Sequence, residues 1–107
     1  MVEKVAALVV DGAPVLAFFL KQDDVVEISK LPGWAAITGA TPRRRREEVI
    51  EGFNQGRFDG LAVTYGVASC GYRFPGAKTL AFAEINNDPT VMAQAAHRAP
   101  QAKTVLV

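Results

Sequence analysis

The sequence of 107 residues has one cysteine, Cys70, one histidine, and a formal net charge of only +1. A single cysteine excludes an internal disulfide and fits a reducing compartment. Because the charges nearly balance, binding to a polyanion would depend on a local basic patch. No apolar stretch approaches the roughly 20 residues that span a bilayer, and the start, MVEKVAALVVDG, is too short and amphipathic for a secretion signal. These absences predict a cytoplasmic protein with no membrane partner.

The composition is that of an ordinary folded domain. Half of the residues are hydrophobic and 21% are charged, which argues against disorder. A chain of this length buries one core but is too short for two. We therefore expect residues 1–107 to form a single domain.

Apolar runs alternate with helix-like patterns along the chain. The runs predict strands over residues 15–20, 34–38, 61–64, 79–83 and 104–107. Helices are predicted over residues 2–10, closed by Gly12 as a C-cap, and over 23–30, with Val25, Val26 and Ile28 inward. A further helix has Thr41 as N-cap and Pro42 at its first position and ends at residues 54–56. The last begins at Asp88-Pro89 and ends near His97.

This alternation predicts crossover connections and a mainly parallel sheet. The expected fold class is α/β: a doubly wound three-layer α/β/α sandwich of five or six strands, with strands 15–20 and 61–64 central. Ligands of such sheets bind beyond the carboxyl ends of the strands. The loops at that position are residues 38–41, 64–75 and 84–89.

The first of these loops leads into four consecutive arginines, residues 43–46. Cations in the first turn of a helix oppose its macrodipole, at about 0.3–1 kcal/mol each when exposed. Pairing of Arg43 with Glu47 and Arg44 with Glu48 would return only about 0.2–0.5 kcal/mol each. A bound anion such as a phosphate would relieve this conflict. The alternative is a solvated charged face with no ligand.

Glycines at positions 66, 71 and 76 of the second loop would allow close approach of a ligand to the backbone. Thr64 could offer a hydroxyl and Arg73 a charge to that ligand. A glycine-rich surface loop without a ligand is, however, commoner than a phosphate-binding loop.

Taken in order, these segments resemble the second RecA-like lobe of superfamily 2 helicases and DNA translocases. VLAFFLKQDD resembles motif IV, and LAVTYGVASCGYRFPGAKTLAFAE resembles motif V with its following strand. NNDPTVMAQAAHRAPQ resembles the Asn-Pro loop and motif VI. TGATPRRRREEVIEGFNQG is similar to G-S-T-P-x-x-x-R-x-x-x-I-x-x-F-N, and the matching residues are Gly39, Thr41, Pro42, Arg46, Ile50, Phe53 and Asn54. The resemblance covers roughly residues 14–105.

The resemblance implies a lobe that binds nucleic-acid backbone and helps to complete an ATPase site, with DNA favoured over RNA. The residues implied to contact backbone phosphates are Thr38, Gly39, Thr41, Arg44, Arg45, Arg46 and Thr64. Those implied to face the nucleotide are Gly71, Gln94 and Arg98, with Arg98 as the catalytic arginine. Such contacts position the backbone and do not read bases.

Two departures from the family pattern concern ATP. Motif VI carries two arginines in the family, but only one is present here in either possible register. Aligned on Gln94, the chain has Gln101 at the finger position; aligned on the A-H-R-x-x-Q ending, Arg98 is the finger. A finger contributes about 10³–10⁵ in rate in other nucleotide hydrolases. The chain also lacks G-x-x-x-x-G-K-[ST] and a Walker B motif, so alone it should not hydrolyse ATP. ATP with Mg²⁺ is expected only with a partner first RecA-like lobe.

The sequence leaves several alternatives open. The chain could be half of a split helicase, a fragment of a longer protein, or a non-catalytic nucleic-acid-binding or protein-interaction module. A cysteine-phosphatase or rhodanese-type site is disfavoured because Cys70 and Arg73 are too close in sequence, and Cys70 is expected to be a small buried hydrophobe. His97 is interpreted as a surface or packing residue and Trp34 as a packing anchor.

Overall fold

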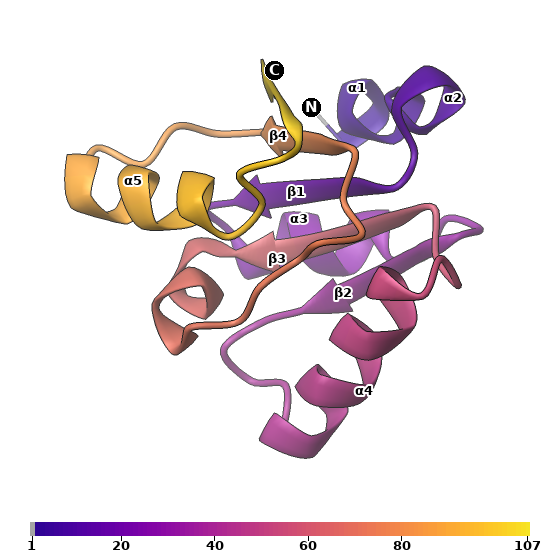
Figure 1. Cartoon of the computed structure of the whole chain (residues 1–107), viewed down its shortest axis with the longest axis horizontal. Helices are drawn as coiled ribbons and strands as arrows, with labels where there is room; N and C mark the ends of the chain where they lie inside the picture. The colour runs from indigo at the N-terminus through magenta and orange to yellow at the C-terminus, as the bar shows by residue number, and fades with distance from the viewer. Residues whose placement is uncertain (1) are drawn as a thin grey trace.

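The computed structural model describes residues 2–107, without the side chains of residues 68 and 69. Its centre is a five-stranded sheet in the order β2-β3-β1-β4-β5, in which every pair of neighbours is parallel (Figure 1). The strands are β1 (Val15–Phe19), β2 (Trp34–Ile37), β3 (Gly60–Thr64), β4 (Thr79–Phe82) and β5 (Lys103–Leu106). The predicted parallel sheet is confirmed, and β1 and β3 are interior strands as expected.

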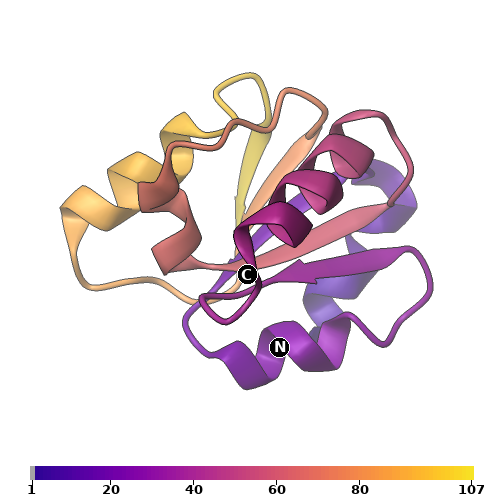
Figure 2. The same ribbon diagram turned by 90° about the horizontal axis from the view of Figure 1, so that it is seen from below.

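Helices cover both faces of the sheet, which gives the predicted three layers (Figure 2). The helical segments are α1 (Val2–Ala7), α2 (Val9–Gly12), α3 (Gln22–Ile28), α4 (Arg43–Asn54), the 3₁₀ helix η1 (Tyr65–Cys70) and α5 (Pro89–His97). One face carries α1 and α3, and the other carries α4, η1 and α5. Among residues 2–107, no helix is long and apolar enough to cross a membrane.

The central strand β1 shows how the sequence sets up two cores. All of its residues are buried, and because side chains alternate between the faces of a strand, it supplies both layers. Leu16 and Phe18 join the core beneath α4 and α5. Val15, Ala17 and Phe19 join the core beneath α1 and α3.

Three predictions about the helices that cover one face are wrong. The N-terminal helix is interrupted at Leu8, and Gly12 is its last helical residue and not a C-cap. Gly12 is needed for packing, because a Cβ there would clash with the hydroxyl of Thr79, which donates a hydrogen bond to the Gly12 carbonyl at 2.9 Å. Val26 is 44% exposed and not inward, because Val25 already points to the sheet and successive helical residues diverge by about 100°.

The starts of α4 and α5 differ in how well the sequence predicts them. At α5, Asp88 is the N-cap and accepts a hydrogen bond from the Thr90 amide at 2.9 Å, with Pro89 at the first position, as predicted. At α4 the predicted cap is wrong by one residue, because Pro42 is the N-cap and no side chain caps the helix. The hydroxyl of Thr41 instead accepts a hydrogen bond from the Thr38 amide at 3.0 Å.

Candidate functional site

The carboxyl edge of the sheet brings together the loops that follow β2 and β3. Ile37 pairs with Val63 in parallel register, so Thr38 and Thr64 follow at the same edge on neighbouring strands. The first loop leads into α4 and the second into η1, and both helical segments begin beyond the ends of these strands (Figure 1). The residues implied to contact nucleic acid therefore come from adjacent segments.

Arg46 connects the turn between β2 and α4 to the end of η1. Its Nε donates a hydrogen bond to the Thr41 carbonyl at 2.8 Å, and its Nη2 donates to the Gly39 carbonyl at 3.0 Å. Its Nη1 lies 3.4 Å from Cys70 Sγ at the end of η1. A guanidinium has five N–H donors, so two remain for a ligand. Arg46 is therefore both a clamp on the loop and a cation held in a fixed place.

The loop between β2 and α4 is a tight turn held by its own hydroxyl groups. Thr38 is 6% exposed, and its Oγ1 accepts a hydrogen bond from the Ala40 amide at 3.2 Å. Because the Thr41 hydroxyl is bonded to the Thr38 amide, both threonines are engaged within the turn. Gly39 is exposed, and a Cβ there would meet no atom within 4 Å. The open surface of this turn is thus at Gly39.

The other arginines of α4 project from its first turns into solvent. The side chains of Arg43, Arg44 and Arg45 are 87%, 93% and 64% exposed. Both expected pairs form, Arg43 with Glu47 at 3.4 Å and Arg44 with Glu48 at 3.9 Å, and Arg45 lies 3.5 Å from the same Glu48. Exposed pairs of this kind stabilise a helix by only about 0.3–0.5 kcal/mol each. The guanidinium groups consequently stay accessible, with a local excess of positive charge.

A depression of about 470 Å³ lies beside these arginines and is lined by Arg43, Arg46, Cys70 and Tyr72. Cys70 is exposed, which corrects the expectation of a buried hydrophobe, because η1 places its thiol against the Arg46 guanidinium. Tyr72, for which the sequence pattern predicted no role, is half-buried and packs against the core under α4.

The loop after β3 uses its glycines for backbone geometry and packing. Gly71 ends η1 in the left-handed conformation, with φ of 82°. At Gly76 a Cβ would lie 2.7 Å from the Cα of Asn54, so this glycine serves close packing against α4. The Asn54 side chain accepts a hydrogen bond from the Gly76 amide at 3.2 Å and donates one to the Arg73 carbonyl at 3.3 Å. Thr64 is half-buried at the end of β3.

Arg98, the predicted catalytic arginine, is the C-cap of α5. Its carbonyl accepts a hydrogen bond from the Phe74 amide at 2.9 Å, which ties the end of the helix to the loop after η1. Its Nε is buried and has no hydrogen-bond partner in the part of the chain that the structure describes. Gln94 lies one helical turn earlier and is exposed. Because α5 packs beside η1, which Gly71 ends, the three residues implied to face the nucleotide come from adjacent segments.

The side chain of Gln101, the other candidate for the finger position, is hydrogen-bonded to the backbone of the same domain. Its side-chain amide donates hydrogen bonds to the carbonyls of Phe74 and Ala77, both at 2.9 Å. These bonds hold the segment between η1 and β4, so Gln101 has a structural role that the sequence did not indicate.

An aromatic cluster near the carboxyl edge includes a perturbed tyrosine. The ring of Tyr65 stacks on Phe18 at a centroid distance of 5.3 Å and on Phe82 at 6.3 Å, and its hydroxyl donates to the Glu84 carbonyl. Burial, and then the nearby Glu84 carboxylate, raise the pKa of Tyr65 from 10.0 to about 12. Glu84 also has a buried Oε1 without a hydrogen-bond partner among residues 2–107. Sequence reasoning gave neither residue a role of its own, although both lie in the loops, 64–75 and 84–89, that it placed at this edge.

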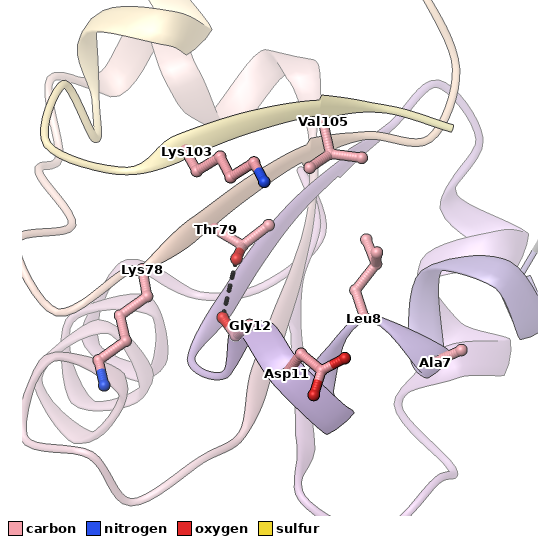
Figure 3. Close-up of a pocket in the computed structure, with 8 residues that line it drawn as sticks. All are labelled: Ala7, Leu8, Asp11, Gly12, Lys78, Thr79, Lys103 and Val105. Atoms are coloured by element: carbon pink, nitrogen blue, oxygen red, sulfur yellow. Dashed lines mark hydrogen bonds between the residues drawn. The ribbon is translucent and has the colours of Figure 1, made fainter.

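The opposite edge of the sheet carries a second depression, of about 360 Å³ (Figure 3). Lys78, Thr79 and Lys103 line it from the amino ends of β4 and β5, and Asp11 and Gly12 line it from α2. The sequence did not predict this depression. It is separated from the arginines of α4 by the length of the strands.

The remaining sequence predictions concern single residues. Trp34 is 7% exposed and packs over Gly60, where a Cβ would lie 2.5 Å from the indole ring, so its role as a packing anchor is confirmed. His97 is exposed at the end of α5. Among residues 2–107, no cluster of histidine, cysteine and acidic side chains could hold a metal ion.

Residues 2–103 match the family model of the helicase conserved C-terminal domain. The chain belongs to this family. Among curated proteins, no sequence matches the chain. This helicase C-terminal domain has the predicted RecA-like fold, since the solved structures below superpose on nearly all of it.

Three of these structures illustrate the likeness. The C-terminal part of the Fun30 ATPase domain has a TM-score of 0.79 and 17% identity over 92% of this chain. Mycobacterium smegmatis helicase Lhr bound to ssDNA and AMP-PNP has a TM-score of 0.76 and 14% identity over 98% of it. S. cerevisiae Dbp5, as a variant bound to Gle1 and IP6, has a TM-score of 0.77 and 15% identity over 98%. The chain spans 35%, 16% and 31% of these three chains, respectively.

Proposed function

We propose that this helicase C-terminal domain acts as the second lobe of an ATP-dependent superfamily 2 helicase or translocase. It binds the backbone of nucleic acid, with DNA favoured over RNA, at the carboxyl edge of β2 and β3. With a first RecA-like lobe, supplied by a separate chain or by a longer polypeptide, it completes an ATPase site. The residues that contact the backbone are Thr38, Gly39, Thr41, Arg44, Arg45, Arg46 and Thr64.

The observation that carries the proposal is the position of Arg46. Its guanidinium bridges the turn at Gly39 and the end of η1, and it keeps two donors for a phosphate. Directly beside it, Arg44 and Arg45 are exposed at the start of a helix that no side chain caps. Uncapped amides and fixed cations at one helix start favour an anion with several oxygens, such as a backbone phosphate.

The salt dependence of binding tests this proposal. A labelled single-stranded oligonucleotide of mixed sequence should bind the chain weakly, with log affinity falling by about 0.7 per log unit of salt for each neutralised phosphate. Replacing Arg44 and Arg45 with alanine should flatten the slope by about 1.4, two such contacts. Arg57→Ala is the matched control, because Arg57 is exposed beyond the other end of α4. An affinity that does not change with salt concentration, or no binding at low salt, would contradict the proposal.

The nucleotide part of the proposal rests on Arg98. A buried Nε without a partner is rare in folded proteins and fits a donor whose acceptor arrives with a ligand or a partner lobe. ATP bound with Mg²⁺ on the first lobe would supply the phosphoryl group, and Arg98 would donate hydrogen bonds toward its phosphates. Gln94 and Gly71 would line the same side of the cleft. The chain has no phosphate loop of its own, so its residues fit a share of a nucleotide site and not a whole one.

A second candidate function is a nucleic-acid-binding or protein-interaction module without ATPase activity. Gln101 favours this module, because its side-chain amide is already hydrogen-bonded to the Phe74 and Ala77 carbonyls. Motif VI then has one arginine where the family has two. Addition of a first lobe that carries a phosphate loop separates the candidates. Turnover that requires both lobes supports the second-lobe function, whereas nucleic-acid binding without turnover supports the module.

A further inference from the structure

Tyr72 lies beside the arginines at the start of α4, but the proposed backbone-binding function assigns it no role. It lines the depression of about 470 Å³ together with Arg43, Arg46 and Cys70. It is half-buried, because part of its side chain packs against the core under α4 while the rest borders the depression. Its hydroxyl makes no hydrogen bond that would explain its position, as judged over residues 2–107.

The surroundings of Tyr72 hold it in place. It follows Gly71, whose left-handed conformation ends η1, and Cys70 of that helix lies against the Arg46 guanidinium. A tyrosine side chain also has few rotatable bonds, so it loses little conformational freedom when a ligand contacts it. The ring and the guanidinium groups of Arg43 and Arg46 therefore form one surface with an aromatic part and a cationic part.

This pairing matches the chemistry of a nucleotide. A base stacks on an aromatic side chain whatever its identity, and the adjoining phosphate binds a cation. The size of the depression lies within the range of about 300–1,000 Å³ that is typical of sites for small ligand groups. Bases in a duplex are stacked on each other and cannot reach the ring, whereas bases of a single strand can.

We propose that Tyr72, with Arg43 and Arg46, forms a subsite that stacks one unpaired base of a single-stranded nucleic acid and holds its phosphate. The inference rests on the proposed backbone-binding function and deepens it, because it makes the single strand the preferred substrate. Arg46 supplies its remaining donors to the phosphate, and Arg43 can leave its exposed pair with Glu47.

The test compares three labelled ligands of equal length: a single-stranded oligonucleotide, an abasic single strand with the same phosphates, and a duplex. The wild-type chain should bind the base-containing strand about fivefold or more tightly than the abasic strand, as expected for one stacked base. Tyr72→Ala should bind both single strands with equal affinity, and Tyr72→Phe should keep the difference. Duplex binding should be unchanged in both variants.

Tyr72→Leu covers the case in which the alanine variant fails to fold, because leucine keeps apolar packing against the core but offers no aromatic face. Equal binding of base-containing and abasic strands by the wild-type chain would overturn the inference. So would a folded Tyr72→Leu variant that retains the difference. In both cases binding of the abasic strand at low salt would still support the backbone function, whereas no binding of any ligand would contradict that function itself.

Discussion

Replacement of Arg46 by alanine should show whether its guanidinium has both a structural role and a binding role. The structural role is the pair of hydrogen bonds to the Thr41 and Gly39 carbonyls, at 2.8 and 3.0 Å. The binding role is the charge that Arg46 would present to a phosphate. Arg45 provides the matched comparison, because it is the neighbouring residue of the same type, is 64% exposed, and makes only an ion pair with Glu48.

The magnitude follows from the two carbonyl bonds. Since Arg46 is half-buried, each bond is worth about 1 kcal/mol net, so Arg46→Ala should lower the free energy of unfolding by about 2 kcal/mol. An unfolding entropy of about 2.1 cal/mol/K per residue over 107 residues makes this a loss of about 9 °C in Tm. Arg45→Ala should change stability by less than about 0.5 kcal/mol.

Thermal and urea unfolding measure the structural role. The slope of log affinity for the oligonucleotide against log salt concentration (the salt slope) measures the binding role. Both variants should reduce the slope by about 0.7, as expected for one lost phosphate contact each. Arg46→Lys should recover most of the slope but little of the stability, because an ammonium cannot reproduce the guanidinium fork. Equal stability of Arg46→Ala and the wild-type chain would refute the clamp, and an unchanged salt slope would refute the phosphate contact.

Two further predictions concern the nucleotide side and the aromatic cluster. Arg98→Ala should leave Tm and oligonucleotide binding nearly unchanged, because its Nε has no partner among residues 2–107, yet it should abolish ATP hydrolysis by the chain mixed with a first lobe. Unaltered turnover would show that Arg98 is only a helix-terminal charge. The folded pKa of Tyr65 is about 12 and its ordinary value is 10.0, so the stability tied to its neutral form is present below pH 10 and lost as the pH rises to about 12. Tyr65→Phe should remove that part of the alkaline loss, measured by urea unfolding across this range.

The fold could be predicted from the sequence because its strands are buried on both faces. Runs such as VLAFF have no polar side of their own, so they indicate a parallel sheet covered by helices without knowledge of any contact. The breaks within elements could not be predicted in this way. The packing at Gly12, the last residue of α2, involves Thr79, which is 67 residues away in sequence and reaches the Gly12 carbonyl only in the folded chain.

The candidate site was predictable at the level of segments but not of individual contacts. The arginine run and the threonines at the strand ends indicated an anion site, and the structure places their segments at one edge of the sheet. The sequence could not show that Thr41 bonds the Thr38 amide and leaves Pro42 as the cap. It also could not show that Cys70 lies against Arg46, since that contact joins α4 to η1, which follow neighbouring strands of the sheet.

The start of α4 is a place where local stability and function conflict. Four cations lie within its first turn and no acidic residue does, so the macrodipole opposes them by about 0.3–1 kcal/mol each. The exposed pairs with Glu47 and Glu48 return less than this. Arg46 avoids part of the cost because backbone carbonyls of the preceding turn accept its hydrogen bonds. The rest is offset only when an anion binds, since a phosphate would satisfy the uncapped amides and the exposed guanidinium groups at once. Binding should therefore stabilise this helix start more than any other, and hydrogen exchange of the α4 amides should slow most when the oligonucleotide is added.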